Sequence, residues 1–225
     1  MNRLKTNRWD FGYTLETMNR EARKRNAPVF RFEDAGKASP FRILVSTMLS
    51  ARTKDETTIQ IVKELFRTVG SPRDVLRLNE KQIEKILYGI GFYRLKAKYL
   101  KQMAEKLINE FNGKVPDTID ALLSLPGVGR KTANIVLARA FGKNTIGVDV
   151  HVHRIANRLG LVKTKRPEDT EQKLVKIVQQ RFKRNFNRTF VAYGQTICIP
   201  RKPKCDECKI RKICKYGQTM INQYH

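Results

Sequence analysis

The chain has 225 residues, of which 40% are hydrophobic; this is enough to fill a core and excludes a disordered tail. Its 46 Lys and Arg exceed 21 Asp and Glu, giving a formal net charge of +25. This excess favours binding to nucleic acid. Individual charges could also be explained by solvated helix faces or by a thermophilic host. No apolar run of about 18 residues offers a membrane span, and the start MNRLKTNRWDF lacks the apolar stretch of a signal peptide, so we expect an intracellular, cytoplasmic protein.

In the first half of the chain, apolar residues repeat at helical spacing. Residues 54–70, 79–90 and 94–113 each place them three and four positions apart, which predicts amphipathic helices with one buried face. Asn79 and Gln82 form a capping box at the start of the second segment. Glycines end the first and the third segments.

The second half shows the same pattern. We expect a helix that starts at Pro116 and Asp117 and stops before Pro126, with a buried side formed by Ile119, Leu122 and Leu123. Residues 131–141 are Ala-rich and predict another helix, and Pro167 starts one with a buried side formed by Leu174, Ile177 and Val178. The alternation in NTIGVDVHV is too weak to predict a strand. The predicted fold class is all-α.

The segment LPGVGRKTA joins two of these helices through a glycine-rich turn. Gly127 and Gly129 let the backbone approach a ligand closely, and the N–H groups beside Val128 and Arg130, at the start of the second helix, favour a phosphate. Such a turn reads no base, so it implies only a grip on the nucleic-acid backbone. An ordinary helix–helix turn is the alternative interpretation.

Lys131 and Asp149 are candidates for catalysis. Arg130 and the positive helix end both favour a neutral Lys131 amine, which could form a Schiff base; a lysine that pairs with phosphate or with solvent is the alternative. Asp149 could stabilise positive charge that develops on a sugar, cap the following helix, or do both. With His151 and His153 it also forms a D-x-H-x-H pattern that can bind a metal, although the chain has only 3 His and no acidic cluster nearby.

The C-terminal segment holds all 4 cysteines of the chain. Cys198, Cys205, Cys208 and Cys214 have the spacing C-x6-C-x2-C-x5-C. In an intracellular protein such a group predicts metal ligands and argues against disulfides. Four thiolates hold either zinc or an iron–sulfur cluster, so their chemistry leaves both possibilities open.

Together, LPGVGRKTA, VDVHVHR and the cysteine spacing resemble endonuclease III, the helix-hairpin-helix family of DNA glycosylases with an iron–sulfur cluster. The likeness extends from about residue 40 to residue 214, with the motifs in the family's order. It implies a 4Fe-4S cluster on the four cysteines and two helical domains with a DNA-binding cleft between them. Residues 33–143 would form a six-helix barrel with the hairpin, and residues 1–32 and 144–225 the cluster domain.

By this resemblance, Lys131 matches the family's nucleophile and Asp149 its catalytic aspartate. The implied activity is that of a bifunctional DNA glycosylase and AP lyase of base excision repair. Such an enzyme acts, here as an expected monomer, on double-stranded DNA with damaged pyrimidines or abasic sites. It removes oxidised pyrimidines and breaks the strand 3′ to the abasic site by β-elimination. A monofunctional thymine or uracil mismatch glycosylase and a non-catalytic lesion-binding protein are the alternatives. Lys131 argues against the first, and the pair of Lys131 and Asp149 argues against the second.

Two positions depart from the family pattern. Arg52 stands where bacterial relatives commonly have a glutamine that fills the gap left by the flipped base. Phe92 stands where a leucine often wedges the duplex, and its aromatic ring would stack there. Both are expected to contact DNA, although packing of Phe92 against Tyr93 is an alternative.

Overall fold

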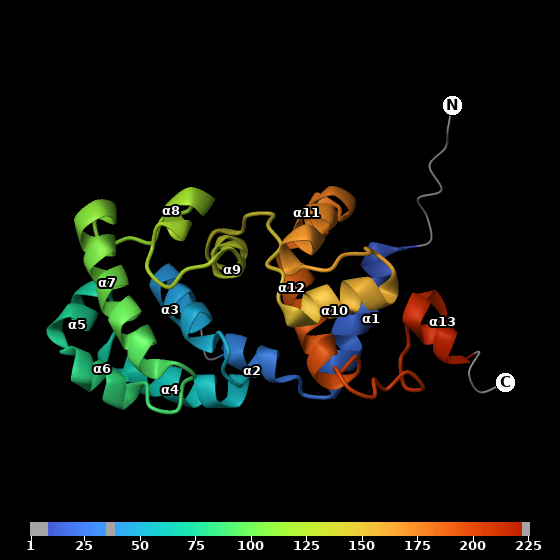
Figure 1. The fold of residues 1–225 in the computed structure, drawn as a ribbon, viewed down its shortest axis with the longest axis horizontal. Helices are drawn as coiled ribbons and strands as arrows, with labels where there is room; N and C mark the ends of the chain where they lie inside the picture. The colour runs from blue at the N-terminus through green and yellow to red at the C-terminus, as the bar shows by residue number, and fades with distance from the viewer. Residues whose placement is uncertain (1–8, 35–38, 222–225) are drawn as a thin grey trace. The chain divides into compact units, whose positions relative to one another are not determined.

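The computed structural model describes residues 9–34 and 39–221. Within these ranges the chain forms helices joined by turns and irregular segments, with no strand, which confirms the all-α prediction (Figure 1). The chain divides into two compact units, Arg31–Lys143 and the combination of Met1–Phe30 with Asn144–His225. No helix in the described part of the chain is long and apolar enough to cross a membrane.

The unit Arg31–Lys143 contains a run of helices in chain order. These are α3 (Pro40–Ser50), α4 (Asp55–Thr68), α5 (Pro72–Arg77), α6 (Glu80–Ile86), α7 (Tyr93–Phe111), α8 (Ile119–Leu123) and α9 (Arg130–Phe141). Helix α3 packs on α4 and α9, and α7 packs on α5 and α6. The hairpin formed by α8 and α9 lies in the same unit as α3 and α7.

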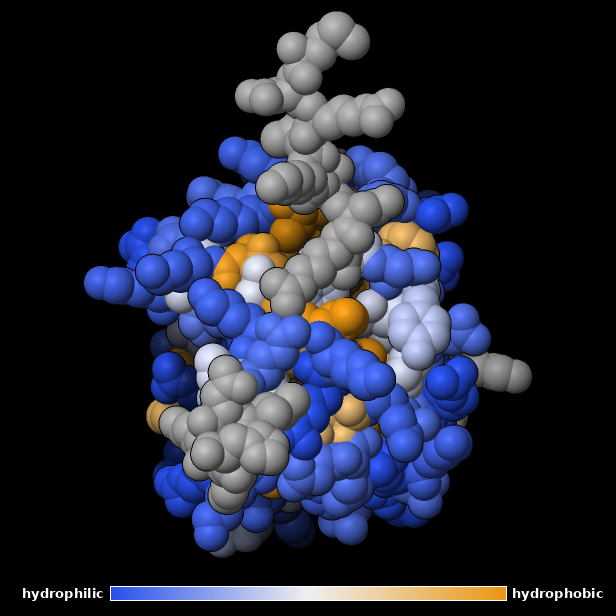
Figure 2. Space-filling view, turned by 90° about the vertical axis from the view of Figure 1, so that its right-hand side faces the viewer, coloured by the Kyte–Doolittle hydropathy of each residue, from blue (hydrophilic) through white to orange (hydrophobic). Residues whose placement is uncertain are grey.

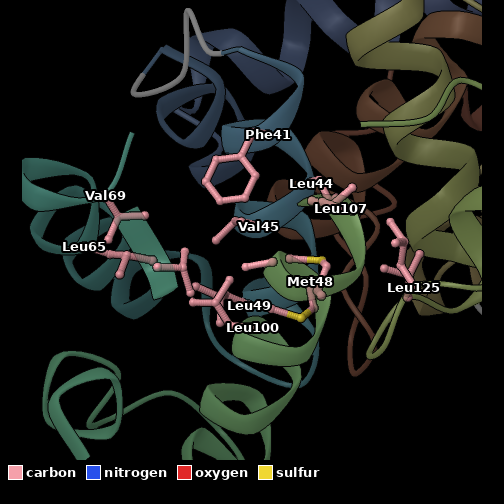
Figure 3. Packing of buried hydrophobic residues seen from close by; sticks show 14 of the residues in the cluster. Phe41, Leu44, Val45, Met48, Leu49, Leu65, Val69, Leu100, Leu107 and Leu125 are labelled. Carbon is pink, nitrogen blue, oxygen red and sulfur yellow. The ribbon is translucent and has the colours of Figure 1, made fainter. Parts of the chain in front are cut away.

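Helix α3 shows how the sequence builds this core. The Ser39 side chain accepts a hydrogen bond from the Arg42 backbone N–H at 3.4 Å, and Pro40 occupies the first turn, where its missing N–H leaves no helical bond unmade. Its apolar residues fall on one face at spacings of three and four and are buried: Phe41, Leu44, Val45, Met48 and Leu49. Figure 3 shows these side chains pointing toward others from α4 and α7, with which they form one apolar cluster.

The other unit contains α1 (Phe11–Lys24), α10 (Val150–Leu159), α11 (Pro167–Ile177), α12 (Gln180–Thr196), the 3-10 turn η1 (Arg211–Ile213) and α13 (Lys215–Ile221). Helix α2 (Pro28–Asp34) contains the boundary between the units. Helix α12 packs against both α1 and α10. A Cβ atom on Gly194 of α12 would lie only 2.5 Å from His151 Nδ1, so this close approach to α10 requires glycine.

Several local predictions are confirmed. Helix α4 lies within 54–70, α7 begins one residue before the predicted segment 94–113, and α11 starts at Pro167. The capping box of α6 is present: the Gln82 backbone N–H donates to Asn79 Oδ1 at 2.9 Å, and the Asn79 N–H donates to Gln82 Oε1 at 2.8 Å. The segment NTIGVDV contains no strand.

Three details of the prediction are wrong. Helix α8 begins at Ile119 with Thr118 as its N-cap, so Pro116 and Asp117 precede it. Leu123 is 38% exposed and Ile177 is 43% exposed, whereas both were expected to be buried. Each lies at the last residue of its helix, where the chain turns away and the helical period no longer determines which side faces the core.

On the face seen in Figure 2, hydrophilic residues predominate and hydrophobic residues form smaller patches between them. With a net charge of +25 over the chain, such a surface attracts polyanions through long-range electrostatics.

Candidate functional site

The turn between α8 and α9 has two glycines with different surroundings. Gly127 has φ +77°, and a Cβ atom there would lie 3.0 Å from both Met48 Sδ and Tyr99 Cδ2. Gly129 is the N-cap of α9, is exposed, and would meet no atom within 4 Å. The first glycine therefore seats the turn on the core, and the second leaves open space on the outer side.

The amino end of α9 can bind an anion. No side-chain hydrogen bond caps this described helix start, so its backbone N–H groups point outward with the positive end of the helix dipole. Arg130 is exposed and Lys131 is half-buried in the first turn. The Val128 side chain is buried in the core, so of this residue only the backbone is placed to face a ligand.

Asp149 lies just before the first turn of α10 and is its N-cap. Its Oδ1 atom accepts hydrogen bonds from the backbone N–H groups of His151 and Val152, both at 2.9 Å. These bonds fix the carboxylate orientation. The side chain is half-buried. Lys131 belongs to the unit Arg31–Lys143 and Asp149 belongs to the other unit.

The two histidines after Asp149 have partners within their own unit. His153 Nδ1 lies 2.7 Å from Thr170 Oγ1, and His151 Nδ1 lies 3.1 Å from Arg154 Nη2. Among the described residues, no group of three or more His, Cys, Asp or Glu is arranged to hold one metal ion. The observed role of Asp149 is therefore that of a helix cap, one of the alternatives that the sequence left open.

Arg52 and Phe92 lie close together in the unit Arg31–Lys143, and we call the two segments that carry them the tip. Both have left-handed backbone conformations, with φ 56° and 59°. The Arg52 guanidinium carbon lies 5.5 Å from the centre of the Phe92 ring, and Phe92 is 61% exposed. The Tyr93 ring pairs edge-on with Tyr88 at 5.6 Å, so Phe92 is left projecting beside Arg52.

Lys96, which the sequence analysis did not single out, lies beneath this tip and is buried. Its Nζ atom donates to the carbonyls of Leu49 at 2.8 Å and Ala51 at 2.6 Å and lies 3.4 Å from Thr53 Oγ1. It thus satisfies carbonyl groups at the carboxyl end of α3. The sequence did contain a signal, because Lys96 lies four residues before Leu100, on the apolar stripe of its helix.

Burial lowers the pKa of Lys96 from 10.5 to about 8. Between pH 8 and pH 10.5 the unfolded chain binds more protons at this lysine than the folded chain does. The free energy of unfolding should therefore increase as the pH rises from 8 to 10.5 and decrease as the pH falls back to 8. Urea denaturation at several pH values should show the stability of the wild type increasing relative to that of Lys96→Met from pH 8 to 10.5. A difference that stays constant with pH would contradict the prediction.

The four cysteines line one pocket within their unit. Cys198, Cys205, Cys208 and Cys214 are free thiols and surround it together with apolar side chains, among them Ile155. Burial raises the pKa of Cys214 to about 11 and also raises that of Cys208. A bound metal would offset this effect because cations favour the thiolate form.

Several donors point at these sulfur atoms. The Tyr193 hydroxyl lies 3.2 Å from Cys208 Sγ, the Gly217 N–H donates to Cys214 Sγ at 3.3 Å, and Arg158 Nη1 donates to Cys198 Sγ at 3.5 Å. Donors of this kind suit negatively charged thiolate ligands. The chemistry of the pocket therefore fits a metal centre held by four thiolates.

Two arginines of α10, which the sequence analysis also did not single out, hold the start of the cysteine segment. Arg154 Nη2 donates to the carbonyl of Cys198 at 2.9 Å, and Arg158 donates to the carbonyls of Ile199 and Pro200, both at 2.7 Å. The same helix begins at Asp149. Helix α10 therefore connects the cysteine segment to the candidate catalytic carboxylate.

Comparison with known proteins identifies the family. The model of the HhH-GPD superfamily base excision DNA repair protein matches residues 45–180. Endonuclease III of Thermotoga maritima is 42% identical over 177 residues, which cover 79% of this chain and 83% of that protein.

Solved structures agree with this result. A non-covalent endonuclease III–DNA complex aligns with a TM-score of 0.82 and 30% identity, over 96% of this chain and 98% of that one. A trapped endonuclease III–DNA covalent intermediate, an estranged-adenine complex, aligns with a TM-score of 0.81 and 30% identity, over 95% and 98%. The chain therefore belongs to the HhH-GPD superfamily of base excision DNA repair proteins and, within it, to the endonuclease III family.

Proposed function

We propose that this protein removes oxidised pyrimidines from duplex DNA and cleaves the strand 3′ to the resulting abasic site through a Schiff base on Lys131. The protein is a DNA glycosylase with AP lyase activity of base excision repair, as its family membership indicates. The observation that carries the assignment to Lys131 is its position in the first turn of α9, directly after the open Gly127–Gly129 turn. Support also comes from the relative that has been trapped as a covalent intermediate with DNA.

The hairpin provides the grip on DNA. A phosphate at the amino end of α9 would accept hydrogen bonds from the outward N–H groups, and the exposed Arg130 adds positive charge there. The open space beside Gly129 allows the nucleic-acid backbone to approach. This contact is independent of sequence, as a search along undamaged DNA requires.

Lys131 then acts as the nucleophile. The target nucleotide leaves the base stack, which is easiest for a damaged base. The neutral amine attacks C1′ as the bond from C1′ to the base breaks, and the base takes the bonding electron pair. The sugar ring opens to a Schiff base, which makes a C2′ proton acidic. Removal of this proton expels the 3′ phosphate, and hydrolysis of the Schiff base regenerates Lys131.

Asp149 stabilises the positive charge that develops on the sugar while the base departs. Its two bonds to the α10 backbone hold the carboxylate in one orientation before substrate arrives. A preorganised charge needs little reorganisation during the reaction, so it lowers the barrier more than a mobile one would.

Arg52 and Phe92 are proposed to enter the duplex where the target nucleotide leaves. The exposed Phe92 ring can stack between base pairs, and Arg52 can fill the vacated space and donate hydrogen bonds to the orphaned base. Their cation–π contact at 5.5 Å holds the two side chains together, so they would enter the duplex as one unit.

The four cysteines are proposed to hold a 4Fe-4S cluster. They line one pocket, and membership of the endonuclease III family supports an iron–sulfur cluster over a single zinc there. Bound there, the cluster would crosslink a segment that has few core residues of its own. Redox chemistry is not required for this role.

Purified protein should therefore show a broad violet absorption band and contain iron, because zinc thiolates are colourless. Cys214→Ser should lower both the absorption and the iron content, since three thiolates hold the cluster less well. Metal analysis and the visible spectrum measure this directly. Bound zinc without visible absorption would overturn the cluster assignment.

The proposed activity is tested by incubating excess protein with an end-labelled duplex that carries one oxidised pyrimidine. Release of the free base together with a strand break 3′ to the site is expected, and an undamaged duplex of the same sequence should remain intact. Base release without strand cleavage would favour the monofunctional glycosylase. Tight binding without base release would favour a lesion-binding protein.

A further inference from the structure

Two short segments that are distant in sequence are fastened together beneath the tip of the unit Arg31–Lys143. One follows α3 and carries Arg52, and the other precedes α7 and carries Phe92. The Lys96 amine reaches across from α7 to the carbonyls of Leu49 and Ala51, at 2.8 and 2.6 Å. A single buried side chain of α7 thus holds the carboxyl end of α3.

The backbones of the two segments are also in direct contact. The Gly91 N–H donates to Thr53 Oγ1 at 3.1 Å. A Cβ atom on Gly91 would lie only 2.6 Å from the Arg52 carbonyl oxygen, a distance that requires a backbone to move. The packing of these segments thus leaves no room for a side chain at position 91.

These hydrogen bonds and close contacts explain how two unfavourable backbone conformations persist next to each other. Arg52 and Phe92 both have positive φ values, which are unfavourable for residues with a side chain. Such conformations survive where the surrounding structure determines them and are typical of functional sites. Burying Lys96 is also unfavourable, in line with its lowered pKa of about 8. The tip therefore combines three features that each cost free energy: two positive φ angles and one buried lysine.

Helices α3 and α7 also support the hairpin between α8 and α9. Met48 of α3 and Tyr99 of α7 are the side chains that pack against Gly127. The hairpin and the tip are consequently built on one pair of helices, and Lys96 joins these helices between the two features. A shift of α3 relative to α7 would displace Arg52 and Phe92 from a hairpin that is held on DNA.

We propose that Lys96 is a positioning residue that locks Arg52 and Phe92 into one rigid element, set at a fixed position relative to the hairpin, for insertion into the DNA duplex. The proposal rests on the proposed function of Arg52 and Phe92. Lys96 does not touch the DNA in this role and acts only through the two side chains that do.

The test compares Lys96→Met with Lys98→Met. Both remove one positive charge from α7, but Lys98 is exposed and lies outside the tip, so it is a matched control. The first readout is the single-turnover rate of base release at saturating protein. Lys96→Met should slow it by about tenfold or more, because displacement by about 1 Å can lower a rate 100-fold, and Lys98→Met should leave it unchanged.

The second readout measures insertion without catalysis. A duplex with a stable abasic analogue opposite 2-aminopurine becomes more fluorescent when inserted side chains unstack that base. Lys96→Met should reduce this signal while it retains the affinity for undamaged duplex, because the hairpin keeps its packing. A wild type that raises the fluorescence but releases no base would refute the proposed activity and leave the positioning role supported.

The decisive comparison places Lys96→Met in an Arg52→Ala/Phe92→Ala background. If Lys96 acts through these two side chains, its removal there should have little further effect on either readout. Equal loss in both backgrounds would overturn the proposal, as would unchanged insertion in Lys96→Met. Should that variant fold poorly, Gly91→Ala displaces the Arg52 backbone with Lys96 intact, and normal insertion by it would also overturn the proposal.

Discussion

Replacing Lys131 with glutamine is expected to abolish the covalent adduct that borohydride traps between the protein and damaged DNA. The amide of glutamine has no basic lone pair and forms no Schiff base. Strand cleavage should fall by about three orders of magnitude or more, as it does when other nucleophiles are removed. Denaturing electrophoresis of the reduced reaction mixture, on a duplex with a single oxidised pyrimidine, measures the adduct.

Lys114→Gln is the matched control for this experiment. It makes the same change at an exposed lysine of the same unit, and it should leave the adduct unchanged. Retention of the adduct in Lys131→Gln would show that another amine is the nucleophile. Absence of the adduct from the wild type, with base release intact, would place the protein among monofunctional glycosylases.

The helices of this protein could be predicted from local patterns because their starts and faces depend on nearby residues. Asn79 and Gln82 are three positions apart and cap α6 as expected, and the apolar period of α7 matches its buried face. The prediction failed at Leu123 and Ile177, which end their helices and are exposed. Whether a terminal residue is covered depends on the next segment of the chain, which local periodicity does not describe.

The candidate site was predictable where chemistry and sequence neighbourhood coincide. The hairpin glycines, Lys131 and the cysteines stand in short motifs, and the cap formed by Asp149 follows from its place before α10. Lys96 could not be assigned a role in this way, because its carbonyl partners Leu49 and Ala51 are 47 and 45 residues away. Only the folded chain brings a lysine on an apolar stripe to the end of another helix.

The arginines of α10 illustrate the same limit. Arg154 and Arg158 bind carbonyl groups that are more than 40 residues later in the sequence, and sequence spacing contains no sign of this pairing. Their position nevertheless has a consequence for the proposed chemistry. A change in the cysteine segment should displace α10 and with it the cap at Asp149, so the cysteine pocket and the carboxylate should respond together.

Asp149 has two roles that substitution can separate. Asparagine caps a helix about as well as aspartate, so Asp149→Asn should retain the bonds to the His151 and Val152 N–H groups and leave the melting temperature nearly unchanged. It removes the negative charge, and base release should therefore fall about 100- to 1,000-fold, as when a preorganised electrostatic group is lost. Single-turnover base release and thermal unfolding measure the two effects on the same preparation.

Asp149→Ala should lose both roles. Its rate should fall as in Asp149→Asn, and loss of the cap should also lower the free energy of unfolding by about 0.5–2 kcal/mol. Asp10→Ala is the control, because Asp10 caps α1 through the Tyr13 N–H at 3.0 Å. It should reduce stability to a similar extent without changing the rate. If Asp149→Asn retained full activity, the carboxylate would be a helix cap alone, and the charge that stabilises the sugar would have to come from another residue.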